Sequence, residues 1–410
     1  MTVAPSRISV AIACGGTGGH LFPGLAVAGQ LRERDCAVTL FVSPKDVDQR
    51  AVKGLEGMQV MTLPAVAFQS GSRLAFFRAS LESYRALKAR FCRRLPAGAS
   101  AVRSAGGSRY ESSPDAALSM GGFTSAPVLL AARRCGAAIF LHESNAVPGR
   151  ANRLLSWLAD QAFVGFPAAA QRLRRCQTVV TGTPVRPQFT PRNVAASRLE
   201  LGLHPDRPVV LVVGGSQGAS GLNEAVMAAL PLFARLQPDT QWIHLAGPRD
   251  TERVKAAYAA ARLPAIVLDF FDAMEVALGA ATVAVSRSGA SCLAELAAMR
   301  VPAVLVPFPA AADNHQWHNA RNFEATGAAR LLEQKSATPE MLTRTLGELL
   351  DQPAVRDQMR AALARWHKPG VAADIAEAIL EAVAASRARS AQYARKTGAC
   401  SCGCDASLVS

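Results

Sequence analysis

Short runs of β-branched and aliphatic residues alternate along this chain with alanine-rich stretches of helical periodicity. Apolar runs bounded by glycine are typical of buried parallel strands, and the stretches between them are typical of covering helices. The strands predicted in the first half span residues 8–13, 38–42, 116–120, 138–142, 161–165 and 178–181. Those predicted in the second half span residues 209–213, 241–246, 265–268, 283–286 and 303–306. Two such series predict an α/β protein with two doubly wound domains, and three prolines between residues 181 and 191 place the boundary there.

Composition makes the chain an ordinary globular protein, because 50% of its 410 residues are hydrophobic and 19% are charged. Nine cysteines spread over this length do not suggest a disulfide framework, so we expect free thiols in a reducing compartment. The Cys400, Cys402 and Cys404 cluster has no second ligand cluster, and we do not expect it to hold a metal. Residues 1–7 are too short for a signal peptide, and no window is apolar enough to span a bilayer, so any membrane contact is expected to be peripheral.

Positive charge is concentrated in the first half of the chain. Residues 1–186 carry 23 basic and 10 acidic side chains, whereas residues 187–386 carry 18 and 20. A basic surface can bind nucleic acid, an anionic membrane or a phosphorylated substrate. We expect no nucleic-acid partner, because the basic run lacks a recognition motif and stacking aromatics. The two halves therefore bind different partners.

Glycine-rich turns follow three of the predicted strands. They are Gly15-Gly16-Thr17-Gly18-Gly19-His20, Gly121-Gly122-Phe123 and Gly214-Gly215-Ser216-Gln217-Gly218. Backbone N–H groups of such turns can approach a phosphate at the start of a helix. None has the Gly-x-Gly-x-x-Gly spacing, and no acidic residue follows the second strand, which argues against an NAD-dependent oxidoreductase. Three such turns on two domains predict a cleft for two phosphorylated ligands.

Polar side chains near these turns could carry the chemistry. His20 is a candidate general base, although a histidine at a helix start can simply bond the backbone. The segments His142-Glu143-Ser144-Asn145, Arg287 to Glu295, and Asp313 to Asn319 could bind sugar hydroxyls and phosphate, or could be ordinary helix caps. Asp46 and Asp48 follow an edge-type strand, so we expect them on the solvated surface rather than at a metal.

In order from about residue 8 to residue 385, these motifs resemble the undecaprenyldiphospho-muramoylpentapeptide β-N-acetylglucosaminyltransferases, the MurG family of peptidoglycan synthesis. The motifs that carry the resemblance also include Phe22-Pro23-Gly24, Pro184-Val185-Arg186, Glu295, Gln316 and Asn319. The resemblance implies a GT-B fold, in which two Rossmann-like domains face each other across a cleft. It implies inverting transfer of N-acetylglucosamine from UDP-GlcNAc to the muramoyl 4-hydroxyl of lipid I, which yields lipid II. A lipid glycosyltransferase with another acceptor, such as diacylglycerol, is the closest rival.

The resemblance also implies roles for particular residues. His20 is the candidate base, and the loops that bind acceptor and phosphate contain Gly16, Thr17, Gly18, Gly19, Gly121 and Gly122. The UDP-GlcNAc site would contain Thr17, Gly18, Gly19, Asn145, Arg186, Ser216, Gln217, Phe271, Ala290, Glu295, His315, Gln316 and Asn319. Among these, the backbone of Phe271 would contact uracil and Glu295 would contact the ribose. No cofactor or metal is implied, because helix dipoles and loop amides can stabilise the departing UDP.

Three positions depart from the family pattern. Thr183 stands where asparagine is common, Phe123 where an aromatic hydroxyl is frequent, and His315 where glutamine is often found. The first two weaken any assignment of a substrate hydrogen bond to those side chains. The third adds a second candidate base near the sugar.

Residues 73–94 contain seven basic residues and one acidic residue, with apolar residues at helical spacing. Such a helix can face the protein core, or its start can contact anionic lipid through Arg73, Leu74, Phe76, Phe77 and Arg78. The expected partners are UDP-GlcNAc, lipid I, an anionic membrane surface and other cell-wall synthesis proteins, at the cytoplasmic face of the cell membrane.

The expected domains follow from the boundary and the resemblance. Residues 1–186 form an acceptor and membrane-facing domain, and residues 187–370 bind the UDP-sugar. A helix at about 371–386 packs back onto the first domain, and residues 387–410 form a disordered tail. Residues 96–113, rich in Gly, Ser and Ala, are expected to form a surface loop.

Overall fold

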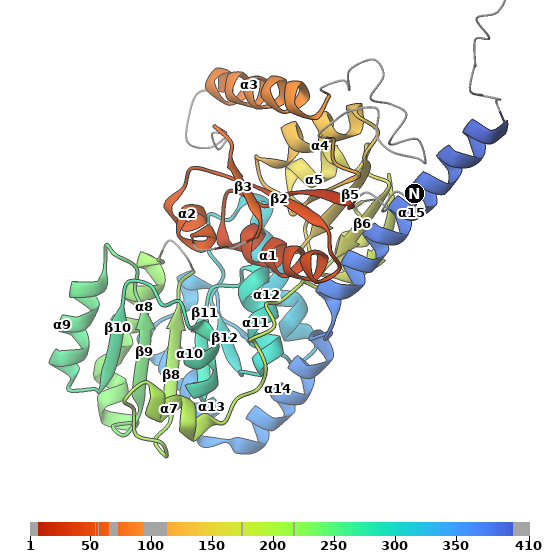
Figure 1. The fold of residues 1–410 in the computed structure, drawn as a ribbon. Helices are drawn as coiled ribbons and strands as arrows, with labels where there is room; N and C mark the ends of the chain where they lie inside the picture. The colour runs from red at the N-terminus through yellow and green to blue at the C-terminus, as the bar shows by residue number, and fades with distance from the viewer. Residues whose placement is uncertain are drawn as a thin grey trace, which may run out of the picture.

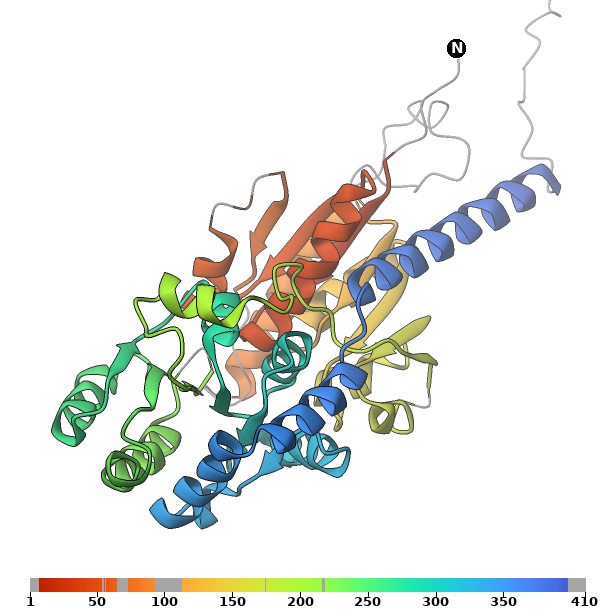
Figure 2. The ribbon, with the colours of Figure 1, turned by 90° about the horizontal axis from the view of Figure 1, so that it is seen from below.

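The computed structural model describes residues 7–53, 55, 57–64, 73–92, 113–173, 175–215 and 218–396. Two lobes are each built around a parallel β-sheet with helices on both faces (Figures 1 and 2). The strand order is β3-β2-β1-β4-β5-β6-β7 in the N-terminal lobe and β10-β9-β8-β11-β12-β13 in the C-terminal lobe. The predicted fold class, two doubly wound α/β domains, is confirmed.

The strands of the N-terminal lobe are β1 (Ser9–Ala13), β2 (Ala37–Val42), β3 (Gln59–Thr62), β4 (Ala116–Ser119), β5 (Ala138–Glu143), β6 (Gln161–Val164) and β7 (Gln177–Val180). Its helices are α1 (Gly18–Glu33), α2 (Asp46–Val52), α3 (Arg73–Phe91), α4 (Ser125–Arg134), α5 (Arg150–Leu155) and α6 (Pro167–Ala170). The six strands predicted for this lobe are present within two residues of their expected bounds. The seventh, β3, has polar residues at both ends and was not predicted.

The strands of the C-terminal lobe are β8 (Val209–Val213), β9 (Gln241–Leu245), β10 (Ala265–Leu268), β11 (Val283–Ser286), β12 (Ala303–Leu305) and β13 (Arg330–Leu331). Its helices are α7 (Val194–Glu200), α8 (Ser220–Leu236), α9 (Thr251–Ala261), α10 (Met274–Ala280), α11 (Ala290–Met299), α12 (His315–Ala325), α13 (Pro339–Asp351) and α14 (Pro353–Trp366). The two-residue strand β13 was not predicted, because it is too short to show a pattern.

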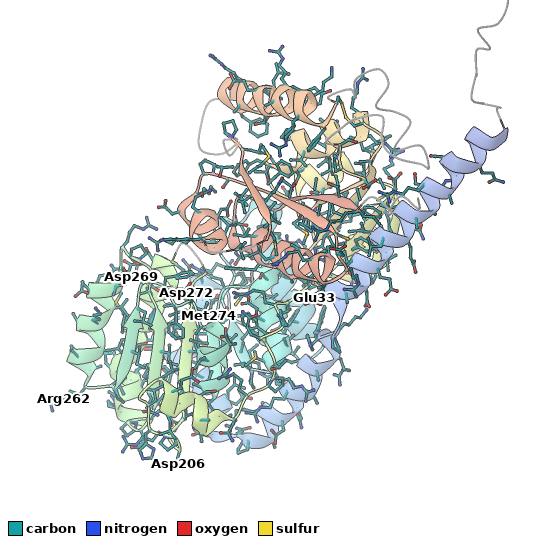
Figure 3. The ribbon with its side chains drawn as sticks, viewed as in Figure 1. Glu33, Asp206, Arg262, Asp269, Asp272 and Met274 are labelled. Atoms are coloured by element: carbon teal, nitrogen blue, oxygen red, sulfur yellow. A yellow bond between two sulfur atoms is a disulfide. The ribbon has the colours of Figure 1, made fainter. Side chains whose placement is uncertain are left out.

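The carboxyl ends of the strands of both lobes lie at the boundary between the lobes. In the C-terminal lobe, Asp269, Asp272 and Met274 follow β10 and lie at the edge facing the other lobe (Figure 3). Asp206 and Arg262, which precede strands, lie at the opposite edge. The strand order reverses beside β1 and beside β8, and in open α/β sheets ligands bind at such reversals.

The last helix, α15 (Val371–Lys396), returns to the N-terminal lobe (Figures 1 and 2). Its Ile375 and Ile379 are fully buried in the same core as Leu21 and Val27 of α1. Further along, Arg387 Nη2 lies 2.9 Å from an Asp115 carboxylate oxygen. Because the helix begins with this packing, the two lobes are joined by a second connection besides the segment that follows β7.

The expected disorder from residue 387 onward is wrong for residues 387–396, which continue α15. Once the first turns of a helix are fixed by packing, each added alanine, arginine or glutamine extends it at little cost. Residues 397–410, including the three-cysteine cluster, lie outside the described part of the chain, as does nearly all of the loop expected at 96–113.

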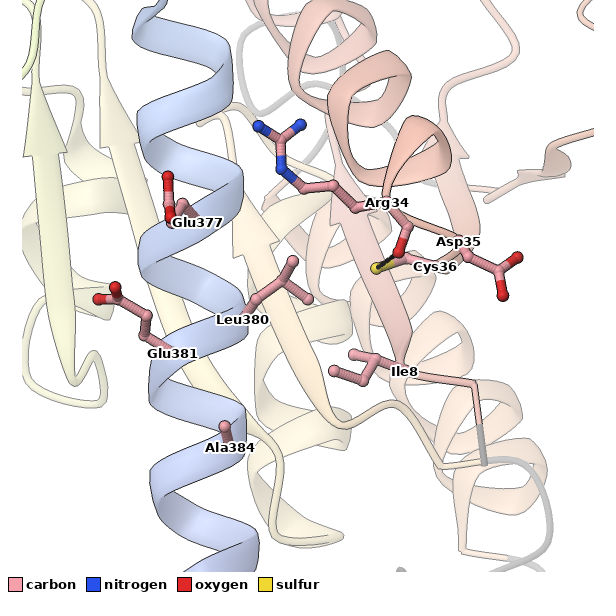
Figure 4. Close-up of a pocket in the computed structure, with 8 residues that line it drawn as sticks. All are labelled: Ile8, Arg34, Asp35, Cys36, Glu377, Leu380, Glu381 and Ala384. Atoms are coloured by element: carbon pink, nitrogen blue, oxygen red, sulfur yellow. Dashed lines mark hydrogen bonds between the residues drawn. The ribbon is translucent and has the colours of Figure 1, made fainter. Parts of the chain in front are cut away.

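A cavity of about 420 Å³ lies between α15 and the turn that joins α1 to β2 (Figure 4). Glu377 and Glu381 line it from α15, and Arg34 lines it from the turn. It is at the amino ends of β1 and β2, on the opposite side of the sheet from the boundary between the lobes. It is therefore separate from the candidate site at the boundary between the lobes.

The basic helix α3 packs on the core at its C-terminal end, whereas contact of its start with lipid stays a prediction. Leu87 and Phe91 are buried against α4, whereas Phe77 and Leu81 are 63% and 46% exposed.

Cys92 and Cys135, at the ends of α3 and α4, form a disulfide with their Cα atoms 6.0 Å apart. The expectation that these thiols are free is therefore wrong, because it rested on spacing, and spacing does not reveal that the two helices pack side by side. Within the described ranges, no helix is long and apolar enough to span a bilayer.

Candidate active site

The first glycine turn lies against the end of the neighbouring strand β2. A Cβ atom at Gly15 would lie 2.5 Å from the backbone nitrogen of Ser43, so only glycine fits there. Gly16 has a φ of +121°, a conformation that L-residues with a side chain rarely adopt. The turn leads into α1, which begins at Gly18 and contacts α11 of the other lobe.

Asp48 holds this turn in place. Its Oδ2 accepts hydrogen bonds from Gly16 N at 2.7 Å, Ser43 N at 3.0 Å and Ser43 Oγ at 2.6 Å. The side chain is fully buried, so the expectation that it lies on the solvated surface is wrong. That expectation treated residues 38–42 as an edge strand, but β3 covers this edge and α2 turns back over the loop.

His20 lies between the first and second glycine turns. A Cβ atom at Gly121 would lie 3.0 Å from His20 Nε2, and one at Gly122 would lie 3.1 Å from Nδ1. Both glycines have positive φ, so the backbone itself makes room for the imidazole. Thr17 Oγ1 lies 3.2 Å from His20 Nδ1. Packing around the ring lowers the pKa of His20 to about 4, and Lys45 and His315 add to this while Asp48 opposes it.

His142 and Glu143 organise the end of β5. Nε2 of His142 donates to the Gly182 carbonyl at 3.1 Å, so Nδ1 accepts from Ser144 Oγ at 3.2 Å. Burial lowers the pKa of His142 to about 4. Because both of its ring nitrogens have protein partners, His142 is a structural residue in this arrangement.

Four N–H groups hold the buried Glu143 carboxylate, two from Asn145 and one each from Gly149 and Asn152. Burial raises the pKa of Glu143, and these hydrogen bonds oppose the shift. Asn152 also donates to the His142 carbonyl at 3.0 Å and lies 3.2 Å from Ser119 Oγ. It therefore joins the ends of β4 and β5.

Asn145 and Asn319 meet across the boundary between the lobes. Asn319 Nδ2 donates to Asn145 Oδ1 at 3.0 Å and to the Ser288 carbonyl at 3.1 Å, and its Oδ1 accepts from Ala146 N at 2.8 Å. Asn319 is fully buried, so a sugar could bind its amide only if these bonds broke. Its assignment to the UDP-GlcNAc site stays a prediction.

Asp313 forms a second connection between the lobes. Its carboxylate lies 2.6 Å from Arg153 and 3.5 Å from Arg150, both on α5. The neighbouring His315 Nδ1 donates to the Ala312 carbonyl at 2.8 Å, which leaves Nε2 as the proton-accepting nitrogen. The charge of His315, on the opposite lobe, adds to the lowering of the pKa of His20.

Arg186 and Glu295 lie where the two lobes meet the connecting segment. The Arg186 guanidinium lies 4.4 Å from the ring centroid of Phe22 and 5.0 Å from that of Phe189, and its buried Nε has no hydrogen-bond partner among the described residues. Burial raises the pKa of Glu295 to about 7, with Glu275 adding to the shift and Arg186 opposing it. Ala290, at the start of α11, lines a small pocket together with Thr183 and Val185 of the connecting segment.

Arg287 and Gln316 fix the loops of the C-terminal lobe. The buried Arg287 donates to the Val306 and Pro307 carbonyls and to Gln334 Oε1, at 2.9, 3.1 and 2.7 Å. Gln316 Oε1 accepts from Phe308 N at 3.0 Å. Phe271 is half-buried against the core of this lobe.

The structure therefore brings together, at one boundary, predicted residues from distant parts of the chain: Gly16, Thr17, Gly18, Gly19, His20, Gly121, Gly122, Asn145, Arg186, Ala290, Glu295, His315, Gln316 and Asn319. Ser216 and Gln217 lie outside the described residues, as do the side chains of Arg73 and Leu74. Lys45, Asp48 and Asn152 were missed. Lys45 and Asp48 could have been found from the sequence because they come just after β2, the strand adjacent to β1. The carboxyl ends of parallel strands share one edge of the sheet, so residues that follow β2 lie near those that follow β1.

Comparison with known proteins gives one consistent result. Residues 10–164 match the glycosyltransferase family 28 N-terminal domain, and residues 209–377 match the glycosyltransferase family 28 C-terminal domain. A protein of Anaeromyxobacter sp. is 35% identical over 386 residues, covering 91% of this chain and 92% of its own length. One of Acidithiobacillus ferrooxidans is 39% identical over 374 residues, covering 91% and 97%. Both are named UDP-N-acetylglucosamine–N-acetylmuramyl-(pentapeptide) pyrophosphoryl-undecaprenol N-acetylglucosamine transferase.

Among solved structures, the crystal structure of Acinetobacter baumannii MurG superposes with a TM-score of 0.67 at 27% identity, covering 92% of this chain and 99% of that one. The calicheamicin glycosyltransferase CalG4 superposes with a TM-score of 0.62 at 18% identity, which shows the shared fold alone.

Proposed function

Because this chain belongs to the MurG group of glycosyltransferase family 28, the family that its motifs resemble, we propose that it makes lipid II. The reaction is transfer of N-acetylglucosamine from UDP-GlcNAc to the muramoyl 4-hydroxyl of undecaprenyl-diphosphate-linked MurNAc-pentapeptide. The observation that carries the proposal is the meeting of His20 and two glycine turns on one lobe with Glu295 and the start of α11 on the other. Transfer of labelled sugar to a lipid I analogue tests it.

The chemistry is a single displacement at C1 of the sugar. The muramoyl 4-oxygen forms a bond to C1, the bond from C1 to the β-phosphate oxygen breaks, and UDP leaves with its electron pair. The hydroxyl proton passes to His20 Nε2. This requires the tautomer with Nδ1 protonated and donating to Thr17 Oγ1. Attack from the face opposite UDP converts the α-linked donor into a β-linked product.

His20 suits this role because it is neutral at physiological pH. Its pKa of about 4 keeps the imidazole unprotonated well below pH 7. The negative charge that develops on UDP would be stabilised by backbone N–H groups at the start of the ten-residue helix α11. His315, whose free Nε2 lies in the other lobe, is the less favoured candidate base.

UDP-GlcNAc is proposed to bind mainly to the C-terminal lobe. In this arrangement Glu295 accepts hydrogen bonds from two ribose hydroxyls, and the backbone of Phe271 contacts uracil. The remaining proposed contacts are Thr17, Gly18, Gly19, Asn145, Arg186, Ser216, Gln217, Ala290, His315, Gln316 and Asn319. The unpartnered Nε of Arg186 and the half-buried Glu295 support a ligand at this boundary.

We also propose that the start of α3 contacts an anionic membrane at the cytoplasmic face. The surface consists of Arg73, Leu74, Phe76, Phe77 and Arg78; Phe77 is 63% exposed and the Arg78 side chain 81% exposed. An exposed aromatic next to an arginine on a helix suits insertion at the headgroup level. The net charge of the N-terminal half supports the same partner.

The variant Phe77→Ser/Arg78→Glu is expected to bind phosphatidylglycerol vesicles at least about tenfold more weakly, because it removes apolar area and reverses one charge. Sedimentation with vesicles measures this. The matched control is Arg235→Glu/Leu236→Ser, which changes an exposed basic and apolar pair on α8 of the other lobe. Equal vesicle binding by the two double variants would contradict a membrane contact at α3.

A further inference from the structure

Lys45 lies between the two glycine turns of the N-terminal lobe, and the proposed transfer reaction gives it no role. It precedes α2, at the carboxyl end of β2. Its ammonium donates to the Gly16 carbonyl at 2.9 Å, on the first turn. The same ammonium lies 5.5 Å from the ring centroid of Phe123, on the second turn. One flexible cation thus contacts both loops that the sequence assigns to phosphate binding.

Among the described residues, the charge of Lys45 has no carboxylate within ion-pair distance. In the described part of the chain, no ion pair involves Lys45, although its side chain is half-buried. Asp48 is close in sequence, but its Oδ2 accepts from Gly16 N and Ser43, and no ion pair joins it to Lys45 within the described residues, where its buried Oδ1 also has no hydrogen-bond partner. An ammonium has three N–H donors, and only one is used here. A partly desolvated cation without a counter-ion is unfavourable unless a ligand supplies the negative charge.

Lys45 and Asp48 together hold the two peptide groups that flank the Cα atom of Gly16. The N–H of Gly16 bonds to Asp48 and its carbonyl bonds to Lys45. Because Gly16 has positive φ, its neighbours Thr17 and Gly18 turn directly into α1, beside His20. The ammonium therefore contacts the turn that leads to the candidate base, and its charge helps to lower the pKa of His20.

We propose that Lys45 binds the diphosphate of the lipid-linked acceptor, as a cationic contact between the two glycine turns. The proposal rests on the proposed function for the identity of the acceptor. The acceptor diphosphate is preferred over that of UDP because Lys45, Gly16 and Phe123 all belong to the N-terminal lobe, whereas Glu295 and Phe271 lie in the other. Phe123 has no hydroxyl to offer a phosphate, and its ring face instead positions the ammonium.

Three substitutions separate binding of the anion from support of the loop. Lys45→Met removes the charge and the hydrogen bond to Gly16. Lys45→Gln keeps an N–H donor for the Gly16 carbonyl but removes the charge. Lys45→Arg keeps both, and Lys255→Met removes one positive charge from the exposed outer side of α9 as a control.

With saturating UDP-GlcNAc, Lys45→Met and Lys45→Gln are each expected to lower kcat/KM for a lipid I analogue by about 10- to 100-fold, mainly through KM. Lys45→Arg should retain most of the activity. The KM for UDP-GlcNAc should change less than about twofold in all variants. With an acceptor analogue that carries a single phosphate, the loss should be smaller, since fewer anionic oxygens reach the ammonium.

Several results would overturn the proposal. Wild-type behaviour of Lys45→Gln would show that only the bond to Gly16 matters. An equal loss with the diphosphate and monophosphate acceptors would give Lys45 a purely structural role. A raised KM for UDP-GlcNAc would assign it to the donor instead.

A binding measurement separates this proposal from the proposed function. Inorganic pyrophosphate is titrated by calorimetry into the enzyme saturated with UDP. Wild type and Lys255→Met should bind it about tenfold or more tightly than Lys45→Met, whether or not lipid I is the acceptor. Equal affinities, or no binding to wild type, would overturn the assignment, whereas failure of wild type to use lipid I would overturn only the proposed function.

Discussion

Replacement of His20 by alanine is expected to lower kcat by about 10²- to 10⁴-fold, the usual range for loss of a general base. Affinity for UDP should be unchanged, because the donor is proposed to bind mainly to the other lobe. Since Gly121 and Gly122 leave room for the ring, its removal creates a gap beside the turns without forcing them apart. Single-turnover transfer measures the rate, and calorimetry with UDP measures the binding.

The pH dependence distinguishes a base from a structural histidine. With a pKa of about 4, His20 is neutral until the pH falls to that value, so kcat at saturating substrates should fall only near pH 4 to 5. His315→Gln, at the second candidate base, is the matched control and should retain most of kcat. Full turnover by His20→Ala with intact UDP binding, or a large loss in His315→Gln alone, would refute the assignment.

Replacement of Glu295 by glutamine should raise the KM for UDP-GlcNAc by roughly 10²-fold at pH 8, with a much smaller effect on kcat. A carboxylate can accept from two ribose hydroxyls, and hydrogen bonds to a charged group contribute about 1.5 to 3 kcal/mol each. Because burial raises the pKa of Glu295 to about 7, its ionised fraction decreases as the pH falls through 7. The wild-type kcat/KM for UDP-GlcNAc should therefore decrease below pH 7, and this decrease should be absent in Glu295→Gln.

Glu275→Gln provides the matched control for this prediction. Glu275 helps to raise the pKa of Glu295, so its neutralisation should move the pH-dependent decrease to lower pH while KM at pH 8 stays near the wild-type value. An unchanged KM at pH 8 in Glu295→Gln would contradict ribose recognition by this carboxylate.

The sequence was sufficient to predict the two sheets, because buried parallel strands are continuous apolar runs. The run at 209–213 is β8, every residue of which is buried. Strand β3 was missed because Gln59 and Thr62 interrupt its pattern. The packing of the last helix on the first lobe was expected only through the family resemblance, because contacts such as those of Ile375 join residues far apart in the sequence and no local pattern shows them. The disulfide between Cys92 and Cys135 escaped prediction for the same reason.

The candidate site was predictable as far as residues sit at the ends of strands. The glycine turns were recognisable, because glycine is the residue that best tolerates positive φ and close backbone approach. His20 was recognisable because it directly follows the first of these turns. The burial of Asp48 and the position of Lys45 were not, because both depend on how α2 turns back over Gly16. The bond between Asn145 and Asn319 likewise depends on the relative placement of the two lobes.

The most direct test of the proposed function is transfer of labelled N-acetylglucosamine from UDP-GlcNAc to a lipid I analogue by the purified full-length protein. The reaction should be followed in several detergents, with diacylglycerol as an alternative acceptor and His20→Ala as the inactive control. Formation of a β-linked disaccharide on the lipid I analogue, with none on diacylglycerol, is the result predicted here. Absence of transfer to lipid I under all of these conditions, or transfer to diacylglycerol instead, would contradict it.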